Sequence, residues 1–272
     1  MVNLKELRKS AVCELSHSDS PSADVDSILL SMGFSKSDII IGEKEIDENI
    51  FNIAFQRLKE GEPVQYITGG CEFMSLWFEV NPSTLIPRCD TEILVETVID
   101  LCGDKAVKIL DIGTGSGCIP ISLAHYLPRA TVLSVDISEE ALETAKRNAS
   151  SNGVADRCTF KRCDILKELP DFIPDIVVSN PPYIPRKDIE ALEPKVKSFE
   201  PITALDGGAD GLDFYRRISA HIQLTHDGIL AFEVGVNQAS DVAQLMSARF
   251  DNTKIIKDLS GIDRVVVGRL KG

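Results

Sequence analysis

Apolar residues in the first quarter of the 272-residue chain recur every three or four positions, which is typical of amphipathic helices. Polar cap residues stand before several of these apolar runs, and a Gly-Glu-Pro stop follows the last one. Residues 1–68 therefore predict a small helical domain. Its helices are expected at 4–15, at 24–32 with Ser22 or Asp24 as the cap, from Ser35 onward, and at 46–60 with Ile50, Ile53, Ala54, Phe55 and Leu58 on the apolar face.

Residues 69–89 have a different pattern and are expected to connect two domains. The stretch 71–80 is aromatic and β-prone, which predicts a hairpin. From residue 90 onward, short apolar runs alternate with helical periodicity, and this order builds a parallel sheet with helices on both faces. The last two strands are joined by too few residues for a parallel crossover, so an antiparallel hairpin is expected there.

Residues 90–272 thus predict a seven-stranded, mostly parallel α/β domain of Rossmann-like type. The expected helices cover residues 91–101, 119–126, 139–151, 214–224 and 238–250. The expected strands cover residues 107–111, 131–136, 158–162, 175–179, 229–234, 253–257 and 264–269.

Composition narrows the class of protein. No apolar run approaches the roughly 18 residues of a membrane span, and the first residues lack the apolar core of a secretion signal. The seven cysteines are odd in number and form no C-x-x-C pair, which argues against a disulfide framework. We therefore expect a cytoplasmic protein without a membrane partner.

No metal site is expected either. Cys158 and Cys163 fall on opposite faces of a predicted strand, and His221 and His226 lack a metal-binding spacing.

The charge balance is acidic, with a formal net charge of −13. Residues 1–80 alone hold 14 Asp and Glu against 7 Lys and Arg. A protein that binds duplex nucleic acid needs clustered positive charge, and no such cluster is present. We expect no direct contact with nucleic acid. An acidic helical domain suits a basic protein partner, although it could also be a simple packing appendage. A monomer is expected.

A glycine-rich turn follows the first predicted strand of the α/β domain. It runs through Gly113, Thr114, Gly115, Ser116 and Gly117 and leads into a helix. Such a turn lets a ligand approach the backbone closely. The pattern is neither the G-x-G-x-x-G of dinucleotide folds nor a P-loop, so alone it is only a weak sign of a nucleoside cofactor.

The next two strands end in carboxylates. Asp136 closes the second strand, where it can accept hydrogen bonds from both ribose hydroxyls. Asp164 follows the third strand, in a place suited to reading an adenine edge. Each acid could instead be a helix cap, but successive strand ends of this type are hard to explain by capping. The spacing suits adenosine without phosphates.

The fourth strand ends in Asn180-Pro181-Pro182-Tyr183, the most informative part of the chain. Two prolines remove two backbone donors and fix two φ angles, which gives a rigid, non-helical platform. It offers an amide side chain, a bare carbonyl and an aromatic ring. This set suits a planar group that bears an NH2.

In these motifs the chain resembles the HemK/PrmC family of S-adenosyl-L-methionine-dependent methyltransferases. The resemblance extends over nearly the whole chain. Besides the glycine turn, Asp136 and the Asn-Pro-Pro-Tyr motif, it rests on residues 63–69, 72–73, 85–88, 200–201, 204–205, 207–208 and 210–213, and on Glu233, Gln238, Asp263 and Arg264. The chain departs from the family pattern at Cys89-Asp90, at Ile165 and at Gly235-Val-Asn-Gln238.

The resemblance implies a class I methyltransferase fold and transfer of a methyl group to a protein glutamine. S-adenosyl-L-methionine is expected against residues 113–117, Asp136, Asp164, Ile165 and Asn180. The substrate implied is the glutamine of the Gly-Gly-Gln motif in class-1 peptide-chain release factors, methylated on its side-chain nitrogen N5. Residues 1–68 would dock that protein.

The expected catalytic group is residues 180–183. We expect the Asn180 side-chain oxygen and the Pro181 carbonyl to accept the two amide hydrogens of the substrate. Tyr183 would pack against the planar amide, and Pro182 would avoid a competing donor. An amide nitrogen is a weak nucleophile because its lone pair is delocalised. Holding the amide so that this lone pair faces the methyl group is therefore expected to be the main catalytic effect.

Three alternatives stay open from sequence alone. An adenine-N6 methyltransferase of DNA or RNA would use the same motif for a flipped base. A glutamine methyltransferase of a ribosomal protein would share the chemistry and differ only in its docking surface. A binding module that retained the fold without catalysis is the third.

Overall fold

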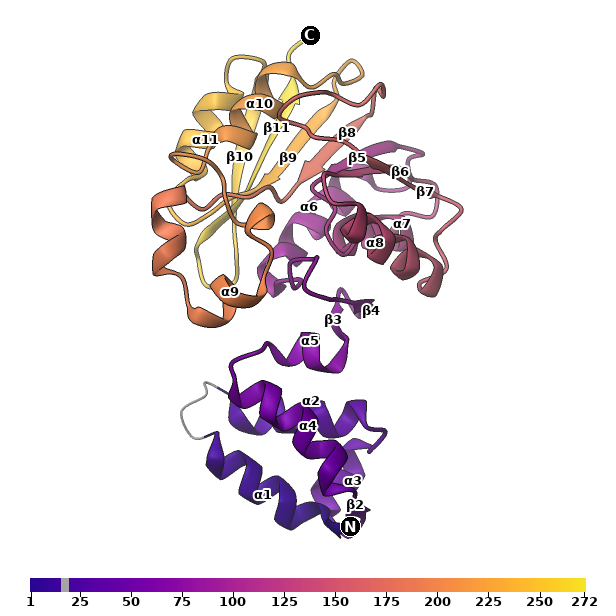
Figure 1. The fold of residues 1–272 in the computed structure, drawn as a ribbon. Coiled ribbons are helices and arrows are strands. Elements are labelled where there is room, and N and C mark those ends of the chain that lie inside the picture. Colours follow the sequence, from indigo (N-terminus) through magenta and orange to yellow (C-terminus); the bar gives the residue numbers. More distant parts are fainter. Residues whose placement is uncertain (16–19) are drawn as a thin grey trace. The chain divides into compact units, whose positions relative to one another are not determined.

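Two units make up the chain in the computed structural model, which describes residues 1–15 and 20–272 (Figure 1). Unit 1 comprises Met1–Gly70 and Pro194–Phe199, and unit 2 comprises Cys71–Glu193 and Glu200–Gly272. Each unit has its own hydrophobic core.

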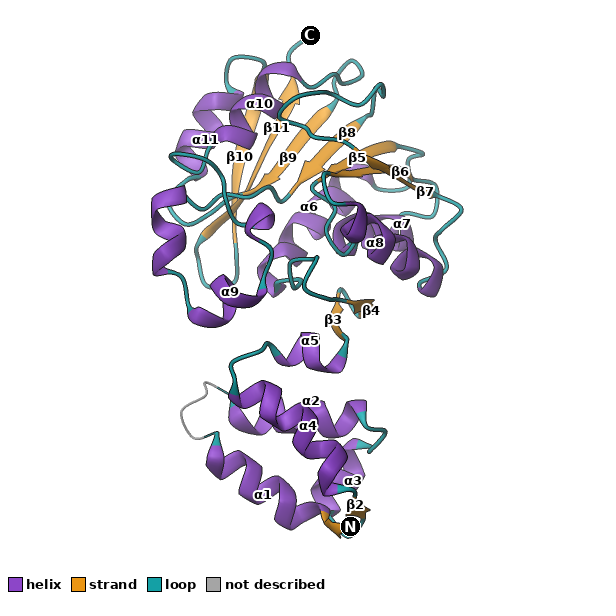
Figure 2. Cartoon of the chain, in the orientation of Figure 1, coloured by secondary structure: helices purple, strands orange, loops and turns teal. Residues whose placement is uncertain are grey.

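Unit 1 is helical, as the purple ribbons of Figure 2 show. Asn3, Ser35 and Asp47 cap three of its helices by accepting hydrogen bonds from backbone N–H groups. Its core is filled by aliphatic side chains of α1 and α2 and by Phe51 of α4. The elements are α1 (Leu4–Glu14), α2 (Pro21–Ser31), α3 (Lys36–Ile41), α4 (Glu48–Lys59), α5 (Val64–Thr68), α9 (Pro194–Phe199) and the paired strands β1 (Val2–Asn3) and β2 (Glu45–Ile46).

Two expectations for unit 1 were wrong. Helix α2 begins at Pro21 with Ser20 at the cap position, because proline is favoured at the first helical position. The apolar face of α4 was predicted correctly at Ala54, Phe55 and Leu58, which pack in the core, but Phe51 is buried there in place of Ile50 and Ile53, which are 57% and 69% exposed. Two apolar stripes compete on this helix, and the one with the larger aromatic side chains is buried.

Unit 2 contains one seven-stranded sheet, in the order β10-β11-β9-β8-β5-β6-β7. Only the last strand of the chain, β11, runs antiparallel to its neighbours β9 and β10, so the predicted fold class is confirmed. The strands are β5 (Lys108–Ile112), β6 (Thr131–Asp136), β7 (Cys158–Arg162), β8 (Ile176–Ser179), β9 (Ile229–Glu233), β10 (Phe250–Lys257) and β11 (Asp263–Leu270).

Helices cover both faces of this sheet (Figure 2). Residues that alternate along β5 belong to different cores: Ile109 packs with α6, α7 and α8, and Leu110 packs with α10 and α11. Burial on both faces explains why the central strands are almost continuously apolar. The helices are α6 (Glu92–Cys102), α7 (Cys118–Tyr126), α8 (Glu139–Ser151), α10 (Asp213–His221) and α11 (Ala239–Met246).

The predicted hairpin is present as β3 (Gly70–Phe73) and β4 (Leu76–Glu79), joined through Met74 and Ser75 with positive φ. Residues 186–204 were not assigned any element from sequence. They contain two short 3₁₀ turns, Arg186–Ala191 and Ile202–Ala204, besides α9.

The order of the strands creates the site. From β5 the chain proceeds to β6 and β7 on one side of the sheet, and then returns to place β8 on the other side of β5. A crevice forms beyond the carboxyl ends of parallel strands where the direction of winding reverses, and ligands bind there in open α/β sheets.

The buried face of α4 can be tested by a matched pair of substitutions. Phe51→Ala should lower the free energy of unfolding by about 3–5 kcal/mol, because it leaves a cavity in the core of unit 1. Ile53→Ala, on the exposed stripe, should change it by no more than about 0.5 kcal/mol. Urea denaturation of the full chain, followed by far-ultraviolet circular dichroism, measures both. Equal effects of the two changes would refute this assignment.

Candidate active site

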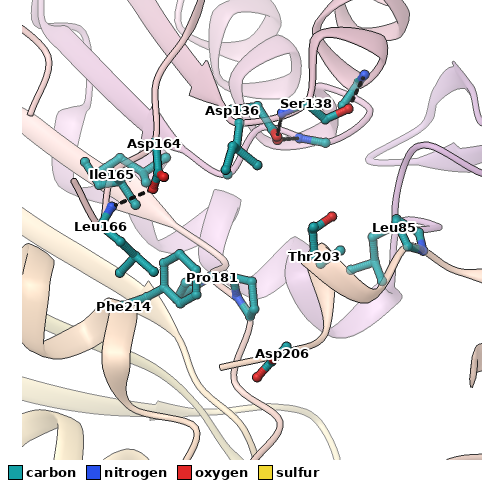
Figure 3. A pocket seen from close by; sticks show the side chains of 18 of the residues that line it. Leu85, Asp136, Ser138, Asp164, Ile165, Leu166, Pro181, Thr203, Asp206 and Phe214 are labelled. Carbon is teal, nitrogen blue, oxygen red and sulfur yellow. Dashed lines mark hydrogen bonds between the residues drawn. The ribbon is translucent and has the colours of Figure 1, made fainter. Parts of the chain in front are cut away.

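The carboxyl ends of strands β5, β6, β7 and β8 open onto one cavity of about 350 Å³ (Figure 3). The cavity belongs entirely to unit 2. Its lining combines the strand ends with a later segment of the chain. The residues relevant to binding and chemistry are Ser83, Leu85, Gly113, Gly115, Asp136, Ser138, Asp164, Ile165, Asn180, Pro181, Pro182, Arg186, Thr203, Asp206 and Phe214.

The glycine turn is tied to the neighbouring strand. The N–H groups of Gly113 and Thr114 donate to the carbonyl of Val135, at 2.8 and 3.2 Å. Gly113 and Gly115 line the cavity, whereas Thr114, Ser116 and Gly117 are not among its lining residues. Gly117 is instead the N-cap residue that precedes α7, and a Cβ atom there would lie 2.7 Å from Ile121 and 3.0 Å from Ala145.

Asp136 is fixed by the backbone on both of its oxygens. Oδ2 accepts the N–H of Gly115 at 2.9 Å, and Oδ1 accepts the N–H of Ser138 at 2.9 Å (Figure 3). Burial raises the pKa of this carboxyl, and these backbone donors oppose the rise. Each carboxylate oxygen keeps a further lone pair, so the residue can still accept hydrogen bonds from two hydroxyl groups.

Asp164 and Ile165 form the adjoining wall. Asp164 accepts the N–H of Leu166 at 3.2 Å and pairs with Lys167 at 2.8 Å, and the Lys167 hydrogen bond lowers the pKa of the carboxyl. Ile165 is buried, and Phe214 also lines this part of the cavity (Figure 3). Apolar walls next to two carboxylates suit a nucleoside with an uncharged base and a ribose.

Asn180 is held by its nitrogen. Its Nδ2 donates to the hydroxyl of Thr91 at 3.2 Å, so its Oδ1 is left to accept hydrogen bonds elsewhere. Pro181 and Pro182 line the cavity beside it. Tyr183 is not among the lining residues: its ring packs with the core between the sheet and α10 and α11, and burial raises the pKa of its hydroxyl.

The backbone of the Asn-Pro-Pro-Tyr motif is clamped from behind. Gln238 donates from Nε2 to the Tyr183 carbonyl at 2.9 Å and accepts the N–H of Gly235 at 3.0 Å. A Cβ atom on Gly207 would lie 2.7 Å from the Pro182 carbonyl oxygen and 2.9 Å from the Tyr183 Cα. These close approaches leave no room for a side chain at Gly207.

A second segment of the chain fixes the residues after the motif. The N–H of Ile184 donates to the Leu205 carbonyl at 3.1 Å, and the N–H of Arg186 donates to the Gly208 carbonyl at 2.8 Å. The Arg186 guanidinium also pairs with Asp206 at 2.8 Å. The far wall of the cavity is thereby attached to the motif itself.

Sequence reasoning missed several of these residues. Thr91 entered only as the first residue of a predicted helix, and Ser83, Thr203 and Phe214 had no assigned role. Asp111 entered only as the last residue of a predicted strand; it is fully buried, and burial raises its pKa to about 7 while nearby hydroxyls oppose the rise. No local pattern identifies such residues, because they are brought to the site by contacts between distant segments.

Two further properties bear on the class of protein. Within the described residues, no group of three or more His, Cys, Asp or Glu side chains is arranged to hold a metal ion. None of the helices in residues 1–15 and 20–272 combines the length and apolar character needed to span a bilayer.

The family model of the methyltransferase small domain matches residues 89–193. Together with the fold and the cavity, this match identifies the class of protein as a methyltransferase. In fold, the chain is similar to the hMettl16 catalytic domain, solved in complex with the MAT2A 3'UTR hairpin 6. The TM-score is 0.58, the identity is 18%, and the match covers 72% of this chain and 76% of that chain.

Closer relatives give the particular family. A release factor glutamine methyltransferase of Geobacter sulfurreducens is 46% identical over 217 residues, which are 79% of this chain and 75% of the relative. The corresponding protein of Gloeobacter violaceus is 37% identical over 270 residues, or 96% of this chain and 94% of the relative. The chain belongs to the release factor glutamine methyltransferase family. This membership confirms the resemblance drawn from the motifs.

The buried Asp111 makes stability depend on pH. Its pKa of about 7 in the folded protein lies above the ordinary value near 4 of the unfolded chain. Between these values the folded state keeps a proton that the unfolded state has released, so stability falls as pH rises. Asp111→Asn should remove roughly 3 kcal/mol of this fall between pH 5 and 8.

Urea denaturation at both pH values measures the effect. Asp164→Asn is the control: the pKa of Asp164 is lowered, so its contribution is constant in this range and is lost only at more acidic pH. A wild-type pH dependence that persists in Asp111→Asn would show that Asp111 is ionised in the folded protein.

Proposed function

We propose that this protein transfers the methyl group of S-adenosyl-L-methionine to the side-chain nitrogen N5 of the glutamine in the Gly-Gly-Gln motif of class-1 peptide-chain release factors. Family membership supports the reaction and the kind of substrate. The observation that carries the proposal is the Asn180 carboxamide, which is held by its nitrogen beside a cavity suited to a nucleoside.

The cofactor would be held by four sets of groups. The glycine turn would approach it with bare backbone, Asp136 would accept the ribose hydroxyls, and Asp164 with Ile165 would flank the adenine. Asn180 would lie at the reactive end. When bound, S-adenosyl-L-methionine supplies a methyl group made electrophilic by its sulfonium.

The protein's own contribution is to orient the substrate amide. An amide nitrogen is a weak nucleophile because its lone pair is delocalised into the carbonyl. Asn180 Oδ1 and the Pro181 carbonyl would accept its two hydrogens and turn the lone pair toward the methyl group. This arrangement favours the more pyramidal nitrogen of the transition state. The N–C bond forms as the C–S bond breaks, and the extra proton leaves to solvent.

Tyr183 has a different role in this proposal from the one expected from sequence. Because its ring packs in the core, we assign to it the anchoring of the motif, together with Gln238. Stacking of the ring on the substrate amide remains a prediction that a bound complex would test.

Unit 1 is proposed as the docking domain for the release factor. Residues 1–68 hold 12 Asp and Glu against 7 Lys and Arg, and this acidic balance suits a basic partner. Four isoleucines of α3 and α4 are also between 57% and 80% exposed, and apolar groups of this kind are found in the centres of protein interfaces. The docking domain is assigned to residues 1–68, the connector to 69–89 and catalysis to 90–272. A cytoplasmic monomer is the state in which we expect it to act.

Asn180→Ala tests the catalytic proposal. The variant should bind S-adenosyl-L-methionine as the wild-type protein does, but methyl transfer should fall on the order of 100-fold or more, because the substrate amide is no longer oriented. The measurement is transfer of labelled methyl to purified release factor, with mass mapping of the modified peptide. Near-normal methylation of the glutamine by this variant would sink the proposed mechanism.

The same assay separates the alternatives. A ribosomal protein fraction and a duplex oligonucleotide serve as competing acceptors for the wild-type enzyme. Label on either of them, with none on the release factor, would replace the proposed substrate.

Asp136→Ala tests the cofactor site. Loss of a charged acceptor for the ribose should weaken S-adenosyl-L-methionine binding roughly 10- to 100-fold. Isothermal calorimetry measures the dissociation constant directly. Asp171→Ala, which removes an exposed carboxylate of the same unit, is the matched control and should leave it unchanged. An unaltered affinity in Asp136→Ala would contradict the ribose role.

A further inference from the structure

A buried carboxyl lies directly behind the Asn-Pro-Pro-Tyr motif. Glu233 is the last residue of β9, which pairs with β8 so that Ser179 and Phe232 are register partners. Its side chain is 2% exposed and does not line the cavity. The strand register places Glu233 beside Asn180, and its carboxyl is close enough to Thr91 and Asn180 for both to lower its pKa. Its Oε2 atom is buried and has no hydrogen-bond partner within the described residues. Thr91, also 2% exposed, in turn accepts the Asn180 Nδ2–H at 3.2 Å.

We propose that Glu233, acting with Thr91, is the positioning residue that determines which end of the Asn180 carboxamide faces the cavity. The inference rests on the proposed function in one respect, that Asn180 Oδ1 accepts a substrate hydrogen. The positioning itself concerns only residues of this chain.

The hydrogen-bonding chemistry of Glu233, Thr91 and Asn180 favours one of the two orientations of the Asn180 carboxamide. An ionised carboxylate only accepts hydrogen bonds. It can accept the Thr91 hydroxyl hydrogen, which leaves the Thr91 oxygen lone pairs to accept from Asn180 Nδ2. It can also accept the second Nδ2 hydrogen. If the carboxamide were turned over, Oδ1 would face two acceptors and Nδ2 would face the cavity. That arrangement would bury unpaired acceptors at a cost.

Protonation of Glu233 would remove this preference. A neutral carboxyl also donates, so it could satisfy a turned-over Asn180 by donating to Oδ1. The catalytic acceptor would then point away from the substrate in part of the molecules. The active form is therefore the one with Glu233 ionised.

The surroundings of Glu233 place its pKa near neutral pH. Burial raises the pKa to about 7, and Thr91, Arg264 and Asn180 oppose the rise. Arg264 is shared with Asp90, at 2.7 Å, and with Asp258, at 3.0 Å.

Other titratable groups also face the site. Asp90 favours the neutral form of Glu233, and Tyr183, Tyr215 and Cys118 lie close enough to interact electrostatically with the carboxyl. Burial raises the pKa of all three of these groups, so they stay neutral near pH 7. Turnover should then increase with pH through about 7, as Glu233 loses its proton.

Glu233→Gln tests the inference on the full-length protein. Glutamine has the same shape but carries both a donor and an acceptor, so it no longer selects one orientation. At pH 8, kcat should fall roughly tenfold or more, whereas KM for the release factor and the dissociation constant of S-adenosyl-L-methionine should stay within about twofold. The rise of kcat with pH through about 7 should disappear.

Thr91 provides a matched pair that does not depend on the folding of the Glu233 variant. Thr91→Val removes the hydroxyl and keeps the shape, so it should reproduce the loss of kcat. Thr91→Ser keeps the hydroxyl and should retain most of the activity. A Thr91→Val enzyme as active as Thr91→Ser would overturn the proposal. So would a Glu233→Gln enzyme with wild-type kcat and pH profile, or one whose binding constants worsen as much as its kcat.

A measurement without substrate separates this inference from the proposed function. The side-chain NH2 resonances of Asn180, assigned by their absence in Asn180→Ala, should shift with pH near 7 in the wild-type protein and not in Glu233→Gln. If the wild-type protein fails to methylate release factors but this titration is seen, the proposed function fails and the positioning stands. Resonances that do not respond to Glu233 would refute the positioning, whatever the substrate.

Discussion

The pairing of β5 with β8 sets the geometry on which the site depends. These two central strands run parallel, with Ile112 opposite Ser179, and the Ser179 hydroxyl donates to the Ile112 carbonyl at 2.7 Å. The next residue of each strand is therefore Gly113 on one side and Asn180 on the other. A Cβ atom on Gly113 would lie 3.8 Å from the Asn180 carbonyl oxygen. The turn that would receive the cofactor and the amide that would hold the substrate are neighbours because the strand register makes them so.

Three buried carboxyl groups near the site lower the stability of the fold. Asp111, Glu200 and Glu233 all lie beneath or beside the cavity, and burial raises the pKa of each. Only Glu200 has a direct ionic partner among them, since Arg88 binds it at 2.5 Å. Buried polar groups fix orientation when they are paired and destabilise the fold when they are not. Both oxygens of Asp111, and Oε2 of Glu200 and of Glu233, have no hydrogen-bond partner within the described residues, so these carboxyls lower the stability of the fold.

How far the sequence predicted the molecule depended on how local each feature is. Helix α8 was expected at its observed bounds, Glu139–Ser151, because its periodicity is evident from neighbouring residues, although its cap is Ser138 and not Asp136. The glycine turn and the acids after β6 and β7 were located in the same way. The buried face of α4 was assigned correctly at Phe55 and wrongly at Ile50 and Ile53, since two stripes fit the helical period and only tertiary packing selects between them. The inward position of Tyr183 and the support from Thr91 come from segments far apart in the chain, so no spacing rule could reveal them.

The clamp behind the Asn-Pro-Pro-Tyr motif has a consequence for how such enzymes diverge. Gly207 and Gly235 pack directly on Pro182 and Tyr183, and neither position has space for a side chain. A side chain at Gly207 would collide with the backbone of Pro182 and Tyr183, and one at Gly235 would collide with the side chains of Tyr183 and Gln238, so substitution at these glycines is strongly restricted. Substitutions are easier to accommodate on the side of the cavity away from the motif. There Thr203 lines the cavity and belongs to a segment that is exposed to solvent. A lineage that acquires a new methyl acceptor would keep the Asn-Pro-Pro-Tyr motif unchanged and alter the residues of the cavity rim around Thr203.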